Sequence, residues 1–150
     1  MALALIFSYV ESLIPFNFGV PGIKLGLANV VVVMALYKMK LPDTLLISLI
    51  RIALAGLLFG NIMSLIYSLA GGLLSLGVMI VIKKSRRFSC FGVSIAGGVF
   101  HNAGQILMAM LVTGIPVIAY YLPVLIICGI ITGALIGLIS SRVLLLMANY

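Results

Sequence analysis

The stretch PDTLLISLIRIALAGLLFGNIMSLIYSLAGGLLSLGVMIVIK, residues 42–83, decides the fold of this chain. It is more than 40 residues long and almost wholly apolar. A membrane-spanning helix needs about 20 such residues, so the stretch has room for two. Gly60-Asn61 is its only turn-like dipeptide, and we place a tight reversal there. The stretch therefore predicts a hairpin of two transmembrane helices.

The composition extends this interpretation to the whole chain. Of the 150 residues, 65% are hydrophobic and 7% are charged, whereas soluble domains carry about 25% charge. Two acids and nine bases could not cover a water-soluble globule of this size. Disorder needs the opposite composition, with low hydrophobicity and dense charge. We expect a single integral membrane domain, all-α and polytopic, in a compact bundle.

Interruptions by proline, glycine and charge divide the chain into six expected transmembrane helices. They cover about residues 2–14, 23–39, 42–60, 62–82, 90–112 and 120–139. The first is short, reaching only about 20 Å at 1.5 Å per residue. Either it tilts into a thin region, or the recorded start lies inside a longer helix. A signal peptide fits poorly, because Glu11 interrupts the apolar run and no basic segment precedes it.

The basic residues predict an orientation. A six-helix zigzag puts seven of them on one side and only Lys24 on the other; the seven are Lys38, Lys40, Lys83, Lys84, Arg86, Arg87 and Arg142. By the positive-inside rule both termini are cytoplasmic. The basic residues that give the net charge of +7 are then expected at the membrane surface, where anionic lipids attract them. Nucleic acid is not expected as a partner.

Small residues recur at four-residue spacing, as in Gly56-x3-Gly60 and Gly129-x3-Gly133-x3-Gly137. In lipid such residues let helices approach closely. Because these motifs fall on several separate faces, we interpret them as packing within one bundle and not as one dimer interface. Cys90 and Cys128 stand alone without ligand spacing, and we interpret both as small packing residues.

Polar residues at membrane depth are the candidate site, because an ionisable group there is costly unless it is paired or hydrated. Counting from the helix ends places them in the outer half of the membrane. The candidate substrate-binding residues are Glu11, Lys24, Asn29, Arg51, His101, Asn102 and Gln105. Two other interpretations stay open: Glu11 and Arg51 could form a structural ion pair, and a lone His or Asn could join two helices.

One helix strengthens the binding interpretation. Small and polar residues follow helical spacing along it and form one stripe, made of Ser94, Gly97, Gly98, His101, Asn102 and Gln105. Such a stripe suits a cavity wall that opens to the outside. Three helices would begin at the outer face with their positive dipole ends, and Lys24 and Arg51 outnumber Glu11. We therefore expect a small anionic or mixed polar–aromatic solute.

The sequence lacks the residue clusters that several enzyme classes need. Prenyl diphosphate chemistry needs clustered aspartates to hold Mg²⁺, and the chain has only Asp43 and Glu11, far apart. One histidine cannot supply a zinc protease site. Ser94 and His101 share a face, but about 10.5 Å of helix separates them. We expect neither an enzyme nor a metal or cofactor site.

Several segments together resemble a known prokaryotic family, the Gx transporter family, long labelled heptaprenyl diphosphate synthase component I. The segments run nearly the whole length of the chain in order. They are PGIKLGLAN (21–29), LAGGLLSL (69–76), HNAGQ (101–105), YYLP (120–123) and GIITGALIG (129–137). The combination of PGIKLGLAN with HNAGQ is the most specific part.

That family is similar to the substrate-binding S components of energy-coupling factor (ECF) transporters. The resemblance implies a six-helix bundle in the cytoplasmic membrane, joined to a transmembrane coupling subunit with ATPases. It puts Ala4 and Ser8 at the partner interface. It also implies a lid over the site, made of Pro15, Phe16, Asn17, Phe18, Gly19, Pro21 and Gly22. No ATPase loop motif occurs in the chain itself.

The older label implies a different role. Without an aspartate-rich motif, this chain could only be a non-catalytic membrane partner of a prenyl diphosphate synthase. A purely structural membrane scaffold is the third possibility.

Overall fold

A computed structural model describes residues 2–13 and 28–147. Within them the chain forms six α-helices and one 3₁₀-helix, and no strand. The elements are α1 (Ala2–Leu13), α2 (Asn29–Lys38), α3 (Leu41–Phe59), α4 (Ile62–Lys84), α5 (Cys90–Thr113), η1 (Pro116–Tyr121) and α6 (Leu122–Leu146). The expectation of an all-α bundle is confirmed.

Four of the described helical segments are long and apolar enough to cross a membrane: α3, α4, α5, and η1 with α6. The other two are shorter, 12 residues in α1 and 10 in α2. The second helix was expected from residue 23, but residues 23–27 lie outside the described part. Its described portion starts only at Asn29, after a turn at Ala28. The chain is a helical membrane protein.

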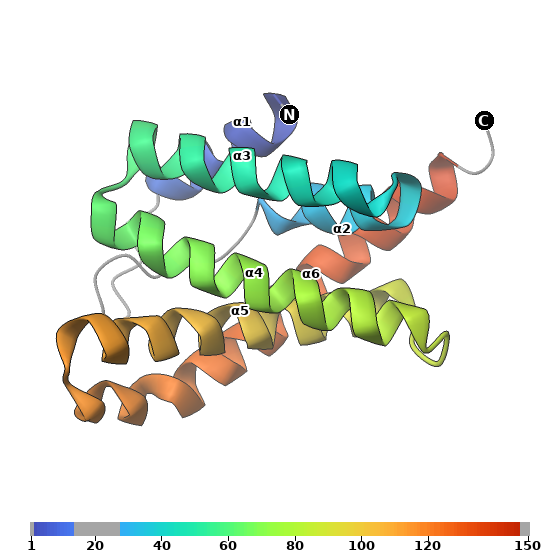
Figure 1. Ribbon diagram of the computed structural model, residues 1–150. Helices are drawn as coiled ribbons and strands as arrows, with labels where there is room; N and C mark the ends of the chain where they lie inside the picture. The colour runs from blue at the N-terminus through green and yellow to red at the C-terminus, as the bar shows by residue number, and fades with distance from the viewer. Residues whose placement is uncertain (1, 14–27, 148–150) are drawn as a thin grey trace.

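The long helices run back and forth (Figure 1). The α3–α4 turn and the connection from α5 to α6 lie at one end of the bundle. The α2–α3 and α4–α5 connections lie at the other, together with the C-terminal part of α6. The seven basic residues named above all belong to this second end, which we call the basic end.

Local chemistry sets the helix ends. Asn61 caps α4, its side-chain oxygen accepting a hydrogen bond from the Ser64 amide at 2.7 Å. Gly114 ends α5 in the left-handed conformation, with φ at 68°. Helix α6 was expected to stop at residue 139 and continues instead to Leu146. Arginine is a good helix former, so the helix continues through Arg142.

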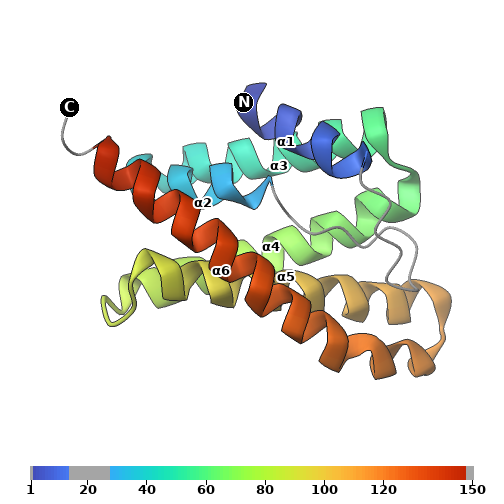
Figure 2. The same ribbon diagram turned by 180° about the vertical axis from the view of Figure 1, so that it is seen from behind.

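Glycines let the last three helices meet backbone to backbone. Helix α6 runs diagonally across α5 (Figure 2), and at the crossing Gly98 faces Gly129 and Gly133. A Cβ built on Gly104 of α5 would lie 2.8 Å from the Gly71 Cα of α4. These small residues therefore pack against other helices of the same chain.

The main apolar core lies around the short helix α2. Val30, Val33 and Leu36 of α2 are buried in one cluster with Leu76 of α4 and Val93 of α5. Asn29, the first residue of α2, lies at the edge of this cluster, where the buried groups change from apolar to polar. The first residue of α2 thus connects the apolar core to Arg51 of α3, whose guanidinium donates a hydrogen bond to the Asn29 side chain.

Candidate functional site

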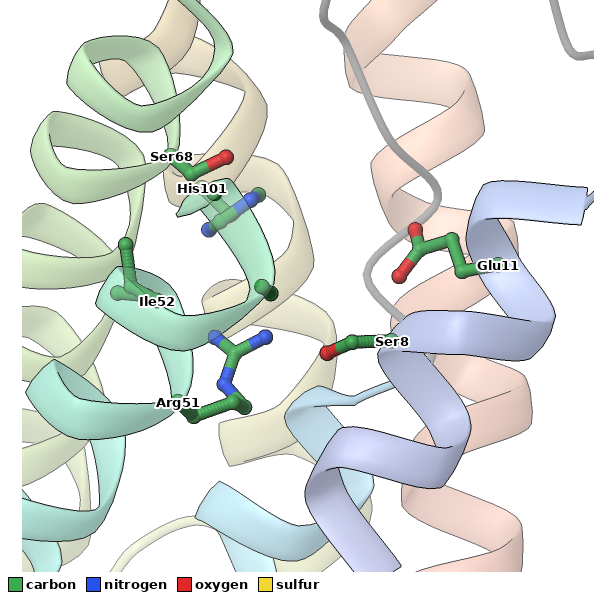
Figure 3. A pocket seen from close by; sticks show the side chains of 8 residues that line it. Ser8, Glu11, Arg51, Ile52, Ser68 and His101 are labelled. Carbon is green, nitrogen blue, oxygen red and sulfur yellow. The ribbon is translucent and has the colours of Figure 1, made fainter. Parts of the chain in front are cut away.

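Four helices enclose a small cavity with polar walls (Figure 3). Its volume is about 20 Å³, room for roughly one water molecule. Helix α1 contributes two residues, α3 four, and α4 and α5 one each. The lining residues are Ser8, Glu11, Arg51, Ile52, Ala55, Gly56, Ser68 and His101.

Arg51 is the central residue of this cavity. Only 7% of the residue is exposed, and one guanidinium nitrogen, Nη2, donates to Oδ1 of Asn29 at 3.2 Å. The Arg51 Nε has no hydrogen-bond partner among the residues that the structure describes. In Figure 3 the guanidinium extends from α3 toward Ser8 of α1, with His101 on its other side. A buried cation of this kind is costly unless its surroundings compensate the charge.

Glu11 supplies that compensation from helix α1. The residue is as deeply buried as Arg51, and its charge interacts favourably with the Arg51 guanidinium. Figure 3 shows the Glu11 side chain directed from α1 toward the cavity. The two formal charges therefore link α1 to α3 through the middle of the site.

His101 closes the cavity from α5. Its ring lies against the backbone of Gly71, where a Cβ would come within 3.3 Å of the His101 Cε1. The His101 Nδ1 finds no partner in the described part of the chain. Gln105, one turn further along α5, is fully buried, and within residues 2–13 and 28–147 its amide oxygen and nitrogen are both unpaired. Several buried polar atoms at this site therefore have no hydrogen-bond partner among the described residues.

The structure brings together four of the expected site residues: Glu11, Arg51 and His101 line the cavity, and Asn29 holds Arg51. Gln105 lies behind His101 and does not line it. Asn102 donates from its side-chain nitrogen to the Leu125 carbonyl at 2.7 Å and so ties α5 to α6.

Lys24 and the expected lid residues lie outside the described residues. The lid residues are Pro15, Phe16, Asn17, Phe18, Gly19, Pro21 and Gly22.

The expected partner interface, Ala4 and Ser8, stays a prediction, and both residues are buried in the structure. Ala4 is 0% exposed and Ser8 is 4% exposed, and Ser8 lines the polar cavity. Both therefore face the inside of the bundle. Small residues on a short helix suit close packing in either direction, so their pattern could not tell an inner from an outer face.

Ser68 is a site residue that the sequence reasoning did not select. It belongs to a stripe of small residues on α4, together with Ser64 and Gly72, and small stripes usually pack helices. In the structure Ser68 lines the cavity while Gly72 packs on Ile52. Only the fold shows that Ser68, unlike its neighbours on the stripe, lines the same cavity as Arg51.

The arrangement is suited to holding a polar group. One guanidinium, one carboxylate, one imidazole and two hydroxyls converge from four helices. Among the described residues no three His, Cys, Asp or Glu side chains gather as metal ligands. These groups offer hydrogen bonds and charge to a polar guest.

The comparisons with known proteins give a family. A family model described as heptaprenyl diphosphate synthase component I matches residues 1–143. No curated protein and no solved structure matches the chain. The description names one component of a synthase, which agrees with a chain that is not itself the catalyst. The similarity to ECF S components stays a prediction. The chain belongs to the heptaprenyl diphosphate synthase component I family.

Proposed function

We propose that the protein is the solute-binding membrane subunit of an ECF-type transporter. The observation that carries this proposal is the buried Arg51 in a cavity that also receives Glu11, Ser68 and His101 from three other helices. Each buried polar atom without a partner costs about 1–3 kcal/mol. For the atoms that lack a partner among the described residues, a purely structural bundle gains nothing from this cost, whereas a binding subunit recovers it when the solute binds.

The donors define the class of solute. Arg51 and His101 present nitrogen atoms, Nε and Nδ1, that have no partner in the described part of the chain. A carboxylate or phosphate oxygen on the solute would accept from both. Glu11 balances the guanidinium charge, so a solute that carries a donor beside its anionic group fits as well. We propose a small anionic or polar–aromatic solute.

Entry of such a solute requires the cavity to widen, since about 20 Å³ holds little more than one water. Helix α1 is the element that can give way. Its described part has 12 residues and, among the described elements, packs chiefly on α3. Tyr9 and Phe59 form a ring pair between the two helices, with centroids 5.2 Å apart. We propose that α1 separates from α3 to admit the solute.

The proposed membrane arrangement completes the transporter. The basic end and both termini face the cytoplasm of a prokaryotic cell by the positive-inside rule, and the cavity lies toward the outer side. A coupling subunit with its ATPases would reach α1 through the exposed side chains of Leu3, Ile6 and Val10.

Joining α1 to α3 tests the opening step. In a Cys90→Ala/Cys128→Ala background, Tyr9→Cys and Phe59→Cys would be linked by a short bifunctional thiol reagent. We expect the linked protein to exchange its solute at least tenfold more slowly than the same protein before linking. The Tyr9→Cys single variant treated with the same reagent is the control. Equal exchange in the linked and unlinked proteins would show that α1 does not move.

Native mass spectrometry tests the function itself. Protein purified from its own membrane in mild detergent should carry a small molecule in one-to-one stoichiometry. Heating the sample until the protein unfolds should release this molecule for identification. A protein that never carries a small molecule, even after exposure to a membrane-free extract of its cells, would argue against a solute-binding subunit.

The family description favours a second function, a non-catalytic membrane component of heptaprenyl diphosphate synthesis. This role predicts co-purification with a soluble, aspartate-rich prenyl synthase subunit. Prenyl transfer by that subunit should then fall at least tenfold when the membrane chain is removed. Co-purification with ATPases and no effect on prenyl transfer would exclude this second role.

A further inference from the structure

A larger cavity lies at the basic end. Its volume is about 330 Å³, and it combines apolar walls with three cations. The lining residues are Leu36, Leu41, Ile80, Lys83, Lys84 and Arg86. No acidic residue is among them. A cavity of this kind suits a guest that is anionic at one end and apolar at the other.

The three cations have different tasks. Lys83 donates from Nζ to the Leu36 carbonyl, and the same nitrogen lies 4.9 Å from the centre of the Tyr37 ring. This lysine therefore holds α4 to the end of α2. Lys84 and Arg86 are exposed, and the structure shows no hydrogen bond from either side chain within the described residues. They are the two charges available to a guest.

Arg86 occupies a backbone position that glycine would favour. Its φ is 55°, in the left-handed region, where the side chain crowds the backbone. The residue ends the turn after α4, its amide donating to the Lys83 carbonyl at 3.2 Å. Glycine is the common residue just past a helix end. Arginine in place of glycine at this position is strained, and its side chain adds a cation to the cavity.

An apolar hollow of about 300 Å³ lies further along α4. Its lining residues are Leu73, Leu74, Gly77, Val78, Val81 and Ile82. Leu73, Gly77 and Lys84 fall on one stripe of the helix, so the hollow leads toward the cationic cavity. A Cβ on Gly77 would meet nothing within 4 Å. The missing side chain leaves room for a hydrocarbon chain beside the helix.

We propose that this surface is a binding site for an anionic phospholipid of the surrounding bilayer. The phosphate headgroup lies between Lys84 and Arg86, and one acyl chain follows the hollow beside Gly77. Basic cavities at the membrane surface attract such headgroups through charge, and apolar contacts hold the acyl chain. The site is at the opposite end of the bundle from the loop of α3 and α4, and it does not depend on the proposed transport function.

Native mass spectrometry of the full chain in mixed micelles tests the headgroup. The micelles contain equal amounts of phosphatidylglycerol and phosphatidylcholine. We expect retention of phosphatidylglycerol in preference to phosphatidylcholine, and a loss of about thirty-fold in this preference in Lys84→Gln/Arg86→Gln. The double variant Arg87→Gln/Arg142→Gln removes the same charge from the same end, outside the cavity, and should keep the preference. Equal losses in the two variants would overturn the site.

Two further experiments test the placement of the acyl chain and the identity of the bound molecule. Gly77→Leu fills the hollow without a clash, so it should retain less phosphatidylglycerol while its thermal stability stays the same or rises. Unchanged retention would overturn the placement of the acyl chain. Inorganic phosphate or farnesyl diphosphate is then added to wild-type protein at the concentration of the lipid. Failure of both to displace the phospholipid supports the proposal, and displacement by either one overturns it.

Discussion

Gly98→Leu should be among the most destabilising single substitutions in this chain. A Cβ at this position would overlap the Gly129 carbonyl oxygen and lie 3.2 Å from the Gly133 Cα. These are backbone atoms of α6, so no side chain can rotate away and the helices themselves must separate. We expect a loss of about 3 kcal/mol or more in the free energy of unfolding. The melting temperature should then fall by on the order of 10 °C.

A thiol-reactive dye can follow this unfolding, because Cys90 and Cys128 are free and only partly exposed. Gly77→Leu is the matched control, since it places the same side chain on a helix position with open space around it. Leucine is also the better helix former, by close to 1 kcal/mol. If Gly98→Leu melted at the temperature of Gly77→Leu, the close crossing of α5 and α6 would be wrong.

Arg51→Met should abolish solute retention and also destabilise the protein. It removes the buried guanidinium while Glu11 keeps its charge in the same cavity. Breaking a buried pair in this way costs about 3–5 kcal/mol. Native mass spectrometry should find no small molecule on the variant, and the dye assay should show a lower melting temperature. Arg142→Met makes the same replacement at an exposed position and should change neither measurement.

A second substitution separates folding from binding. Adding Glu11→Gln to Arg51→Met removes the uncompensated carboxylate charge, so the double variant should regain most of the lost stability. The coupling energy between the two positions should be about 2 kcal/mol. Solute retention should stay absent, because the donors are gone. A double variant that regains both stability and solute would show that Arg51 does not contact the solute.

The turn at Gly60-Asn61 shows how far local sequence can lead. Glycine is a poor helix former and Asn61 is a strong N-cap, so the reversal follows from two residues alone. The apolar runs on either side need only length to become helices. Helix α3 lies at Leu41–Phe59, one residue from the expected range of 42–60.

The inside and outside of a membrane helix are harder to predict. In water, polarity marks the outer face of a helix, but in a membrane the outer face is apolar. Small residues such as Ala4 and Ser8 suit packing inside the bundle or against a partner. Ser8 could therefore be placed at a partner surface by resemblance and yet line the cavity. Glu11 and Arg51 were recognisable because a charge at membrane depth demands a reason. A hydroxyl such as that of Ser68 costs far less to bury than a charge, so its presence in a membrane helix does not indicate a site.

The contact between Lys83 and the Leu36 carbonyl has a consequence for synthesis. The described part of α2 is only 10 residues long, and its last turn is held by a side chain that leaves the ribosome 47 residues later. An isolated helix of this length is marginal. We therefore expect the last turn of α2 to become fixed only after α4 has been synthesised. On this expectation α3 and α4 pair first and α2 docks onto them afterwards, an order of assembly that differs from the order of translation.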